Sequence, residues 1–185
     1  MASTVSISAE LTYIRIRGIL PYFMEAAGLY QVPLAILLGV ASRESRMGLA
    51  LDADGTGDHG YAHGIMQVDI RHHPTFTGRH SPHDHQANID YGAGFLAELI
   101  DAFGGDIKPA VAAYNAGPSR VRSAVSAGLD PDIVTTGGDY AGDVLARTEL
   151  VEAVIGITKA SSLAVYVLPA GLLGLLTYHF LTAPQ

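Results

Sequence analysis

The 185-residue chain contains no cysteine, which excludes a disulfide framework and any chemistry based on a thiol. Basic residues are also few: 11 lysines and arginines stand against 18 aspartates and glutamates, giving a net charge of -7. A positively charged footprint for nucleic acid is therefore not expected. The N-terminal segment MASTVSISAE lacks the basic start and the apolar run of a secretory signal peptide.

The longest uncharged run lies at the C-terminus. Residues 160–178 are 19 consecutive residues without a charge, close to the roughly 20 that a bilayer-spanning helix needs. Pro169 and two glycines in this run are tolerated in membrane helices. We therefore expect one folded domain over 1–158 and a hydrophobic transmembrane helix within 159–185. A C-terminal helix that packs against the domain is the alternative.

The remaining pattern predicts a mainly α domain. The segment Pro33 to Met47 is apolar on nearly every side and predicts a central buried helix. Helical spacing of apolar residues from Ile89 to Phe103 predicts another long helix. The Gly-, Asp- and His-rich residues 51–64 predict a loop or small hairpin, whereas residues 1–18 fit either a strand or a poorly patterned helix. Shorter helices are expected over 21–27, 108–116, 118–127 and 140–155, a strand or helix start over 65–68, and loops over 70–87 and 129–138.

The stretch from Val40 to Asp69 holds the candidate chemistry. Glu44 stands at the end of the apolar helix, where burial is expected to raise its pKa and keep it protonated near neutral pH. Asp58 and Asp69 follow on polar, glycine-rich chain and are expected to stay ionised. A glycosidase needs this separation of roles between carboxyl groups. Taken singly, each acid also fits an ordinary surface residue.

Four motifs, in order along the chain, carry a resemblance to a known family. They are Ala41-Ser42-Arg43-Glu44-Ser45, then Gly57-Asp58-His59-Gly60 with Gly64-Ile65-Met66-Gln67-Val68-Asp69, then Ala113-Tyr114-Asn115-Ala116-Gly117, and last Asp139-Tyr140-Ala141-Gly142-Asp143-Val144. The region resembles the goose-type lysozymes and, more distantly, the catalytic domain of soluble lytic transglycosylases. The resemblance implies a lysozyme-like α+β fold: helices around the buried central helix, with a small β or loop element at a cleft.

The resemblance also implies roles for the matching residues. Glu44 would be the general acid that protonates the leaving glycosidic oxygen, and Asp58 and Asp69 would hold the hydrolytic water. The cleft residues that contact the sugar or orient Glu44 would be Gln67, Tyr114, Asn115 and Tyr140. From the residues alone, Tyr114 and Asn115 fit a core tyrosine and a helix-capping asparagine equally well. Tyr140 also fits the apolar face of its helix.

The implied partner is peptidoglycan, cleaved at the β-1,4 bond between N-acetylmuramic acid and N-acetylglucosamine. An inverting hydrolase needs a second carboxylate about 6.5–9.5 Å from its acid, and the presence of both aspartates favours this chemistry. The alternative is a lytic transglycosylase, in which the sugar's own 6-hydroxyl attacks and leaves a 1,6-anhydro end. A wall-binding module or a membrane-acting lysis factor is a more distant alternative.

Some features depart from the family. The disulfides of some goose-type members are impossible here, and the gap from Glu44 to Asp58 is about one residue longer than the common pattern. The chain is acidic, so affinity is expected to rest on hydrogen bonds and stacking rather than on electrostatic steering. The hydrophobic tail would anchor the catalytic domain to a membrane, facing the cell wall, as suits a phage or prophage lysis protein or a wall-remodelling enzyme.

Histidines concentrate in one part of the chain, with seven of eight between His59 and His85. A metal site is one interpretation, but no ligand set in this stretch has a recognised spacing. We interpret the segment as a solvated loop and expect no metal and no cofactor.

Overall fold

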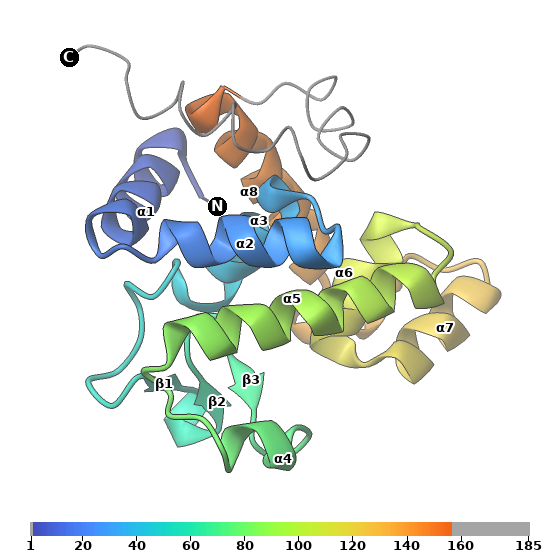
Figure 1. Cartoon of the computed structure of the whole chain (residues 1–185). Helices are drawn as coiled ribbons and strands as arrows, with labels where there is room; N and C mark the ends of the chain where they lie inside the picture. The colour runs from blue at the N-terminus through green and yellow to red at the C-terminus, as the bar shows by residue number, and fades with distance from the viewer. Residues whose placement is uncertain (1, 157–185) are drawn as a thin grey trace.

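Helices dominate the part of the chain that the computed structural model describes, residues 2–156 (Figure 1). The α-helices are α1 (Thr4–Ile16), α2 (Leu20–Tyr30), α3 (Leu34–Ser45), α4 (Pro74–Thr77), α5 (His85–Ala102), α6 (Ile107–Ala116), α7 (Pro118–Ser126) and α8 (Tyr140–Ile155). Turns of 3-10 helix are η1 (Asp58–Gly60), η2 (Pro131–Val134) and η3 (Thr136–Gly138), and the strands are β1 (Thr56–Gly57), β2 (Ala62–His63) and β3 (Val68–Asp69). A mainly helical domain with a small β element is confirmed.

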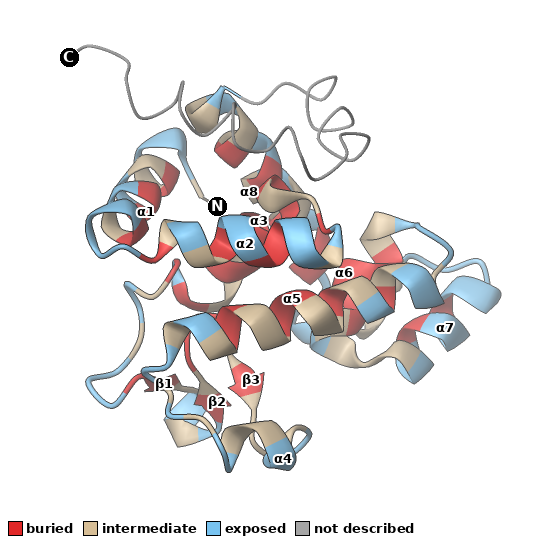
Figure 2. Ribbon diagram, in the orientation of Figure 1, coloured by how far each residue is buried: buried red, intermediate tan, exposed pale blue. Residues whose placement is uncertain are grey.

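Helix α3 forms the centre of the core because its sequence is apolar on nearly every side. Leu37, Leu38 and Val40 are completely buried, and Figure 2 shows this helix lying behind α2. Pro33 precedes the first turn, and Arg46 ends the helix in the left-handed conformation, with φ at 53°. The central buried helix expected from the sequence is confirmed.

The ambiguous N-terminal segment is a helix. Ile7, Leu11 and Ile14 are buried at helical spacing, and the hydroxyl of Ser3 caps the first turn by accepting from the N–H of Ser6 at 3.2 Å. Ile16, which gave the segment its alternating pattern, is 77% exposed and lies at the helix end. The spacing of the buried residues, rather than the local alternation, therefore decides the structure.

The strands form an antiparallel sheet in the order β1-β2-β3, with Gly57 opposite Ala62 and Ala62 opposite Asp69. Buried side chains tie this sheet to the helices, among them Asn88 on α5. Asn88 accepts a hydrogen bond of 2.8 Å from the N–H of Met66 and donates one of 2.8 Å to the carbonyl of His63. The expected hairpin is confirmed, and α5 helps to fix its position.

The expectation of a polar loop over 70–87 is wrong at residues 85–87, where α5 already begins after its N-cap Asp84. It is also wrong for Pro74–Thr77, which forms α4. The physical reason is aromatic packing. The ring of Phe76 stacks on that of Tyr91 in α5, with 4.2 Å between centroids.

The predicted membrane helix within 159–185 lies outside the described residues. Within 2–156, no helix combines the length and the apolar character needed to cross a bilayer.

The contact between α3 and α8 gives a test of the fold. A methyl group on Gly39 would lie 2.5 Å from Oγ1 of Thr148 and 3.0 Å from the carbonyl of Val144. Gly39→Ala should therefore lower the free energy of unfolding by about 1–3 kcal/mol, measured by urea denaturation. The matched control is Gly28→Ala in α2, where no atom lies within 4 Å of the added methyl group. The control should be neutral or stabilising by up to ~1 kcal/mol, and equal effects at both sites would contradict this packing.

Candidate active site

Glu44 lies in the last turn of α3 and is only partly exposed. Its Oε1 accepts a short hydrogen bond from the hydroxyl of Tyr140. Burial raises the pKa of Glu44 to about 7, while the Tyr140 hydrogen bond and the charge of Arg43 act in the opposite direction. The carboxyl group is therefore partly protonated at neutral pH, as expected from its place at the end of an apolar helix.

Two tyrosines support this region from different helices. Tyr140 is the first residue of α8 and is 2% exposed, and burial raises its pKa well above the ordinary value. It stays a neutral phenol that donates to Glu44. Tyr114 of α6 donates to the carbonyl of Met66 at 3.0 Å, and burial also raises its pKa. Tyr114 thus attaches the turn between β2 and β3 to α6.

Asp58 and Asp69 are brought together by Arg71, a residue that the sequence analysis did not single out. Nη2 of Arg71 lies 3.1 Å from Oδ2 of Asp58 and 2.5 Å from Oδ2 of Asp69. The hydrogen bond from Arg71 lowers the pKa of Asp69. The Asp69 side chain is 24% exposed against 56% for Asp58, so Asp69 is the more buried of the two. The guanidinium also stacks on the Tyr61 ring, 4.5 Å from its centroid.

Gln67 and Asn115 make hydrogen bonds within the fold. Gln67 adopts a left-handed backbone conformation, with φ at 48°, and its Nε2 donates to the carbonyl of Gly64 at 2.8 Å. Its Oε1 lies so close to Gly57 that a Cβ there would meet it at 2.2 Å. Asn115 accepts from the N–H of Thr136 at 2.8 Å and is exposed. Asn115 therefore joins the end of α6 to η3, and its bond does not orient Glu44.

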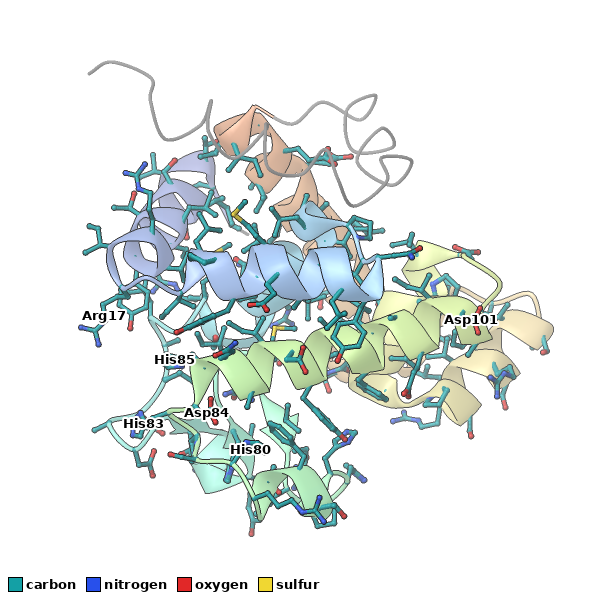
Figure 3. The ribbon with its side chains drawn as sticks, viewed as in Figure 1. Arg17, His80, His83, Asp84, His85 and Asp101 are labelled. Carbon is teal, nitrogen blue, oxygen red and sulfur yellow. The ribbon has the colours of Figure 1, made fainter. Side chains whose placement is uncertain are left out.

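The histidine-rich segment gathers beside the first turn of α5, where Figure 3 shows His80, His83, Asp84 and His85. Nδ1 of His80 lies 3.3 Å from Oδ2 of Asp84, and the ring of His83 packs close to Gly55. Within the described part of the chain, no group of at least three His, Cys, Asp or Glu side chains is arranged to hold a metal ion.

The chemistry of the site is that of a glycoside hydrolase. One carboxylic acid has a pKa raised to near neutrality by its apolar surroundings, and a separate pair of aspartates shares an arginine. Such enzymes divide the roles of acid and base between carboxyl groups in different environments.

Comparison with known proteins agrees with this class. The chain matches the Lysozyme g family over residues 4–152, and it belongs to that family. It is 35% identical to lysozyme g of Takifugu rubripes in an alignment of 153 residues that covers 76% of this chain and 77% of the fish protein. It is 38% identical to lysozyme g of Struthio camelus in an alignment of 124 residues that covers 62% of this chain and 56% of the ostrich protein. The alignment with lysozyme g of Gallus gallus has 127 residues, is 34% identical, and covers 62% of this chain and 54% of the chicken protein.

The hydrogen bond between Tyr140 and Glu44 predicts a change in titration. Tyr140→Phe removes a donor that favours the carboxylate, so the pKa of Glu44 should rise above about 7. A ¹³C NMR titration of the Glu44 carboxyl carbon measures this directly. Tyr114→Phe is the control, because that hydroxyl donates to a carbonyl group instead. A Glu44 pKa that falls in Tyr140→Phe would contradict the role of the bond.

Proposed function

We propose that this chain is a muramidase that cleaves the β-1,4 bond between N-acetylmuramic acid and N-acetylglucosamine in peptidoglycan, with inversion. The observation that carries the proposal is the state of Glu44, a partly exposed carboxyl group with a pKa of about 7. Such a group holds a proton at neutral pH and can still reach a bound sugar. Membership of the lysozyme g family supports the same substrate.

Glu44 is the general acid in this mechanism. It gives its proton to the leaving glycosidic oxygen as positive charge develops on the sugar ring. Tyr140 holds Oε1 through its hydroxyl, so the other carboxyl oxygen, Oε2, is the one that presents the proton. Because the pKa of Tyr140 is raised well above its ordinary value, the phenol does not compete as an acid.

Asp69, assisted by Asp58, directs the attacking water. Arg71 keeps Asp69 ionised by lowering its pKa, and it links the two aspartates into one unit. An ionised carboxylate is what a water-directing residue must supply. Tyr114 fixes this unit relative to the helices, because its hydroxyl holds the Met66 carbonyl in the hairpin.

One observation favours the second candidate, a lytic transglycosylase. Arg71 contacts both oxygens of Asp69, at 2.9 Å to Oδ1 and 2.5 Å to Oδ2. A carboxylate held in this way is a weaker base, which suits a reaction in which the substrate's own hydroxyl attacks. The two chemistries differ in product: hydrolysis leaves a reducing end, and transglycosylation leaves a 1,6-anhydro end that is lighter by one water.

The catalytic unit that we propose is residues 1–158. The family match over 4–152 falls inside these limits, and the last described helix ends at Ile155. Gln67 lies in the turn before β3, two residues before Asp69 in the chain, so we propose that its side chain faces the sugar when substrate is bound.

Glu44→Gln tests the general acid. Peptidoglycan turnover should fall by roughly two to four orders of magnitude, because the amide cannot donate the proton. Since the folded-state pKa lies above the ordinary value of 4.5, Glu44 costs stability increasingly as the pH rises from 4.5 toward 7. The variant should therefore be at least as stable as the wild type at neutral pH. The control is Glu98→Gln, which changes an exposed acid of α5. Wild-type turnover by Glu44→Gln would contradict the assignment of Glu44 as the general acid.

Asp69→Asn tests the attacking group. For a hydrolase, the rate should fall about a hundredfold or more while mass spectrometry of residual products shows reducing ends. Asp58→Asn should lose less, because its side chain is more exposed and makes one contact with Arg71. Near-full activity of Asp69→Asn with anhydro products would instead establish the transglycosylase.

A further inference from the structure

A chain of polar contacts joins α1, α3 and α8 and includes Ser42, two residues before Glu44. It begins at Glu10 in α1, which is completely buried and accepts from the hydroxyl of Ser42 in α3. Ser42 in turn accepts from Nη1 of Arg147 at 2.9 Å. Arg147 donates from Nε to Oδ2 of Asp143 at 2.8 Å, one turn earlier in α8. Every member of this chain is buried or mostly buried, so each depends on its partners.

Asp143 also pairs with Arg43, the residue directly before Glu44. Nε of Arg43 lies 3.1 Å from Oδ2 of Asp143, an ion pair by distance in which Nε makes no directed hydrogen bond. The guanidinium carbon lies 5.5 Å from the centroid of the Tyr140 ring. Asp139 is a weaker partner, because it is 3.8 Å from Arg43 and its side chain is 70% exposed against 20% for Asp143.

The direction of the Arg43 side chain matters for Glu44. Tyr140 faces Glu44 from α8 and Tyr114 from α6, and Arg43 is the charged neighbour within α3. Consecutive residues of a helix do not face each other, so the partners of the guanidinium decide where it lies. A released guanidinium would be free to pair with the Glu44 carboxylate and hold it ionised.

We propose that Asp143 is a positioning residue that holds Arg43 along α8 and over the Tyr140 ring, and so keeps the guanidinium from pairing with Glu44. The proposal rests on the proposed function of Glu44 as the general acid. It goes beyond that function because Asp143 acts only through Arg43. The position of Asp143 is itself fixed by Arg147, which Ser42 and the buried carboxylate of Glu10 hold in place.

Asp143→Asn in the full-length protein is the test. The amide can still accept from Arg147, but it no longer binds Arg43 as an anion. Released Arg43 should lower the pKa of Glu44 by about half a unit to one unit, measured by ¹³C NMR of its carboxyl carbon. The apparent pKa of the high-pH limb of the activity profile should fall by the same amount. At neutral pH, kcat should fall and KM should change little. A folded Asp143→Asn protein with an unchanged Glu44 pKa would overturn the proposal.

Two control variants distinguish the positioning role of Asp143 from the general effect of removing a carboxylate from α8. Asp143→Glu keeps the anion and should restore the wild-type titration. Glu152→Gln removes a carboxylate from the same helix, about two and a half turns away, and should leave the pKa of Glu44 in place. Should Asp143→Asn not fold, Asp143→Gln compared with Asp143→Glu gives the same comparison, because its amide oxygen can still accept from Arg147 while the charge is absent.

A double-mutant cycle with Arg43→Gln completes the test. In that background Asp143→Asn should barely move the pKa of Glu44, because no guanidinium remains to be released. An equal shift in both backgrounds would overturn action through Arg43. A Glu44 pKa that falls in Asp143→Asn while the activity profile stays fixed would support the positioning of Arg43 and contradict the general-acid role.

Discussion

The close packing of α3 against α8 is the constraint on which the site depends. Gly39 lets the two helices approach until a side chain of any size would collide with Thr148. About one and a half turns later, Glu44 lies in the last turn of α3, where it meets the first residue of α8, Tyr140. The same contact therefore forms part of the core and places the Tyr140 hydroxyl against the Glu44 carboxyl group. A wider separation would leave Glu44 in water, where its pKa would return toward the ordinary value.

The aspartates are positioned by other means, since strands of two residues cannot fix themselves. Asn88 satisfies two backbone groups of the hairpin from inside the core, and Tyr114 satisfies a third, the carbonyl of Met66. Gly64 is required where it stands, because a Cβ would lie 2.5 Å from the Asn88 side chain. Side chains of α5 and α6 thus help to position the hairpin, and its own sequence supplies the charged side chains.

The sequence predicted the features that depend on local pattern. Apolar periodicity located α3 and α5, and the place of Glu44 at the end of an apolar helix predicted its raised pKa. The sequence did not predict features that arise from tertiary contacts. In the sequence, Arg71 looks like an ordinary loop arginine. Only the folded structure brings it to Asp58, thirteen residues away. Glu10 looks like a surface acid in α1, because its partner Ser42 is distant in the chain. The motif match did not indicate that Asn115 accepts a hydrogen bond from the N–H of Thr136, and its contact with the sugar stays a prediction.

The two halves of the site use arginine in opposite ways. Arg71 binds the aspartates directly and so commits Asp69 to the ionised state. In the proposed mechanism Arg43 stands next to the carboxyl group that must keep its proton, and its charge already lowers the pKa of Glu44 from the value that burial alone would give. On that proposal a carboxylate partner for Arg43 is needed beside the general acid and is not needed beside the aspartates. Asp143 is such a partner on α8, the helix that also supplies Tyr140, so the two polar influences that oppose burial at Glu44 are both set where α3 meets α8.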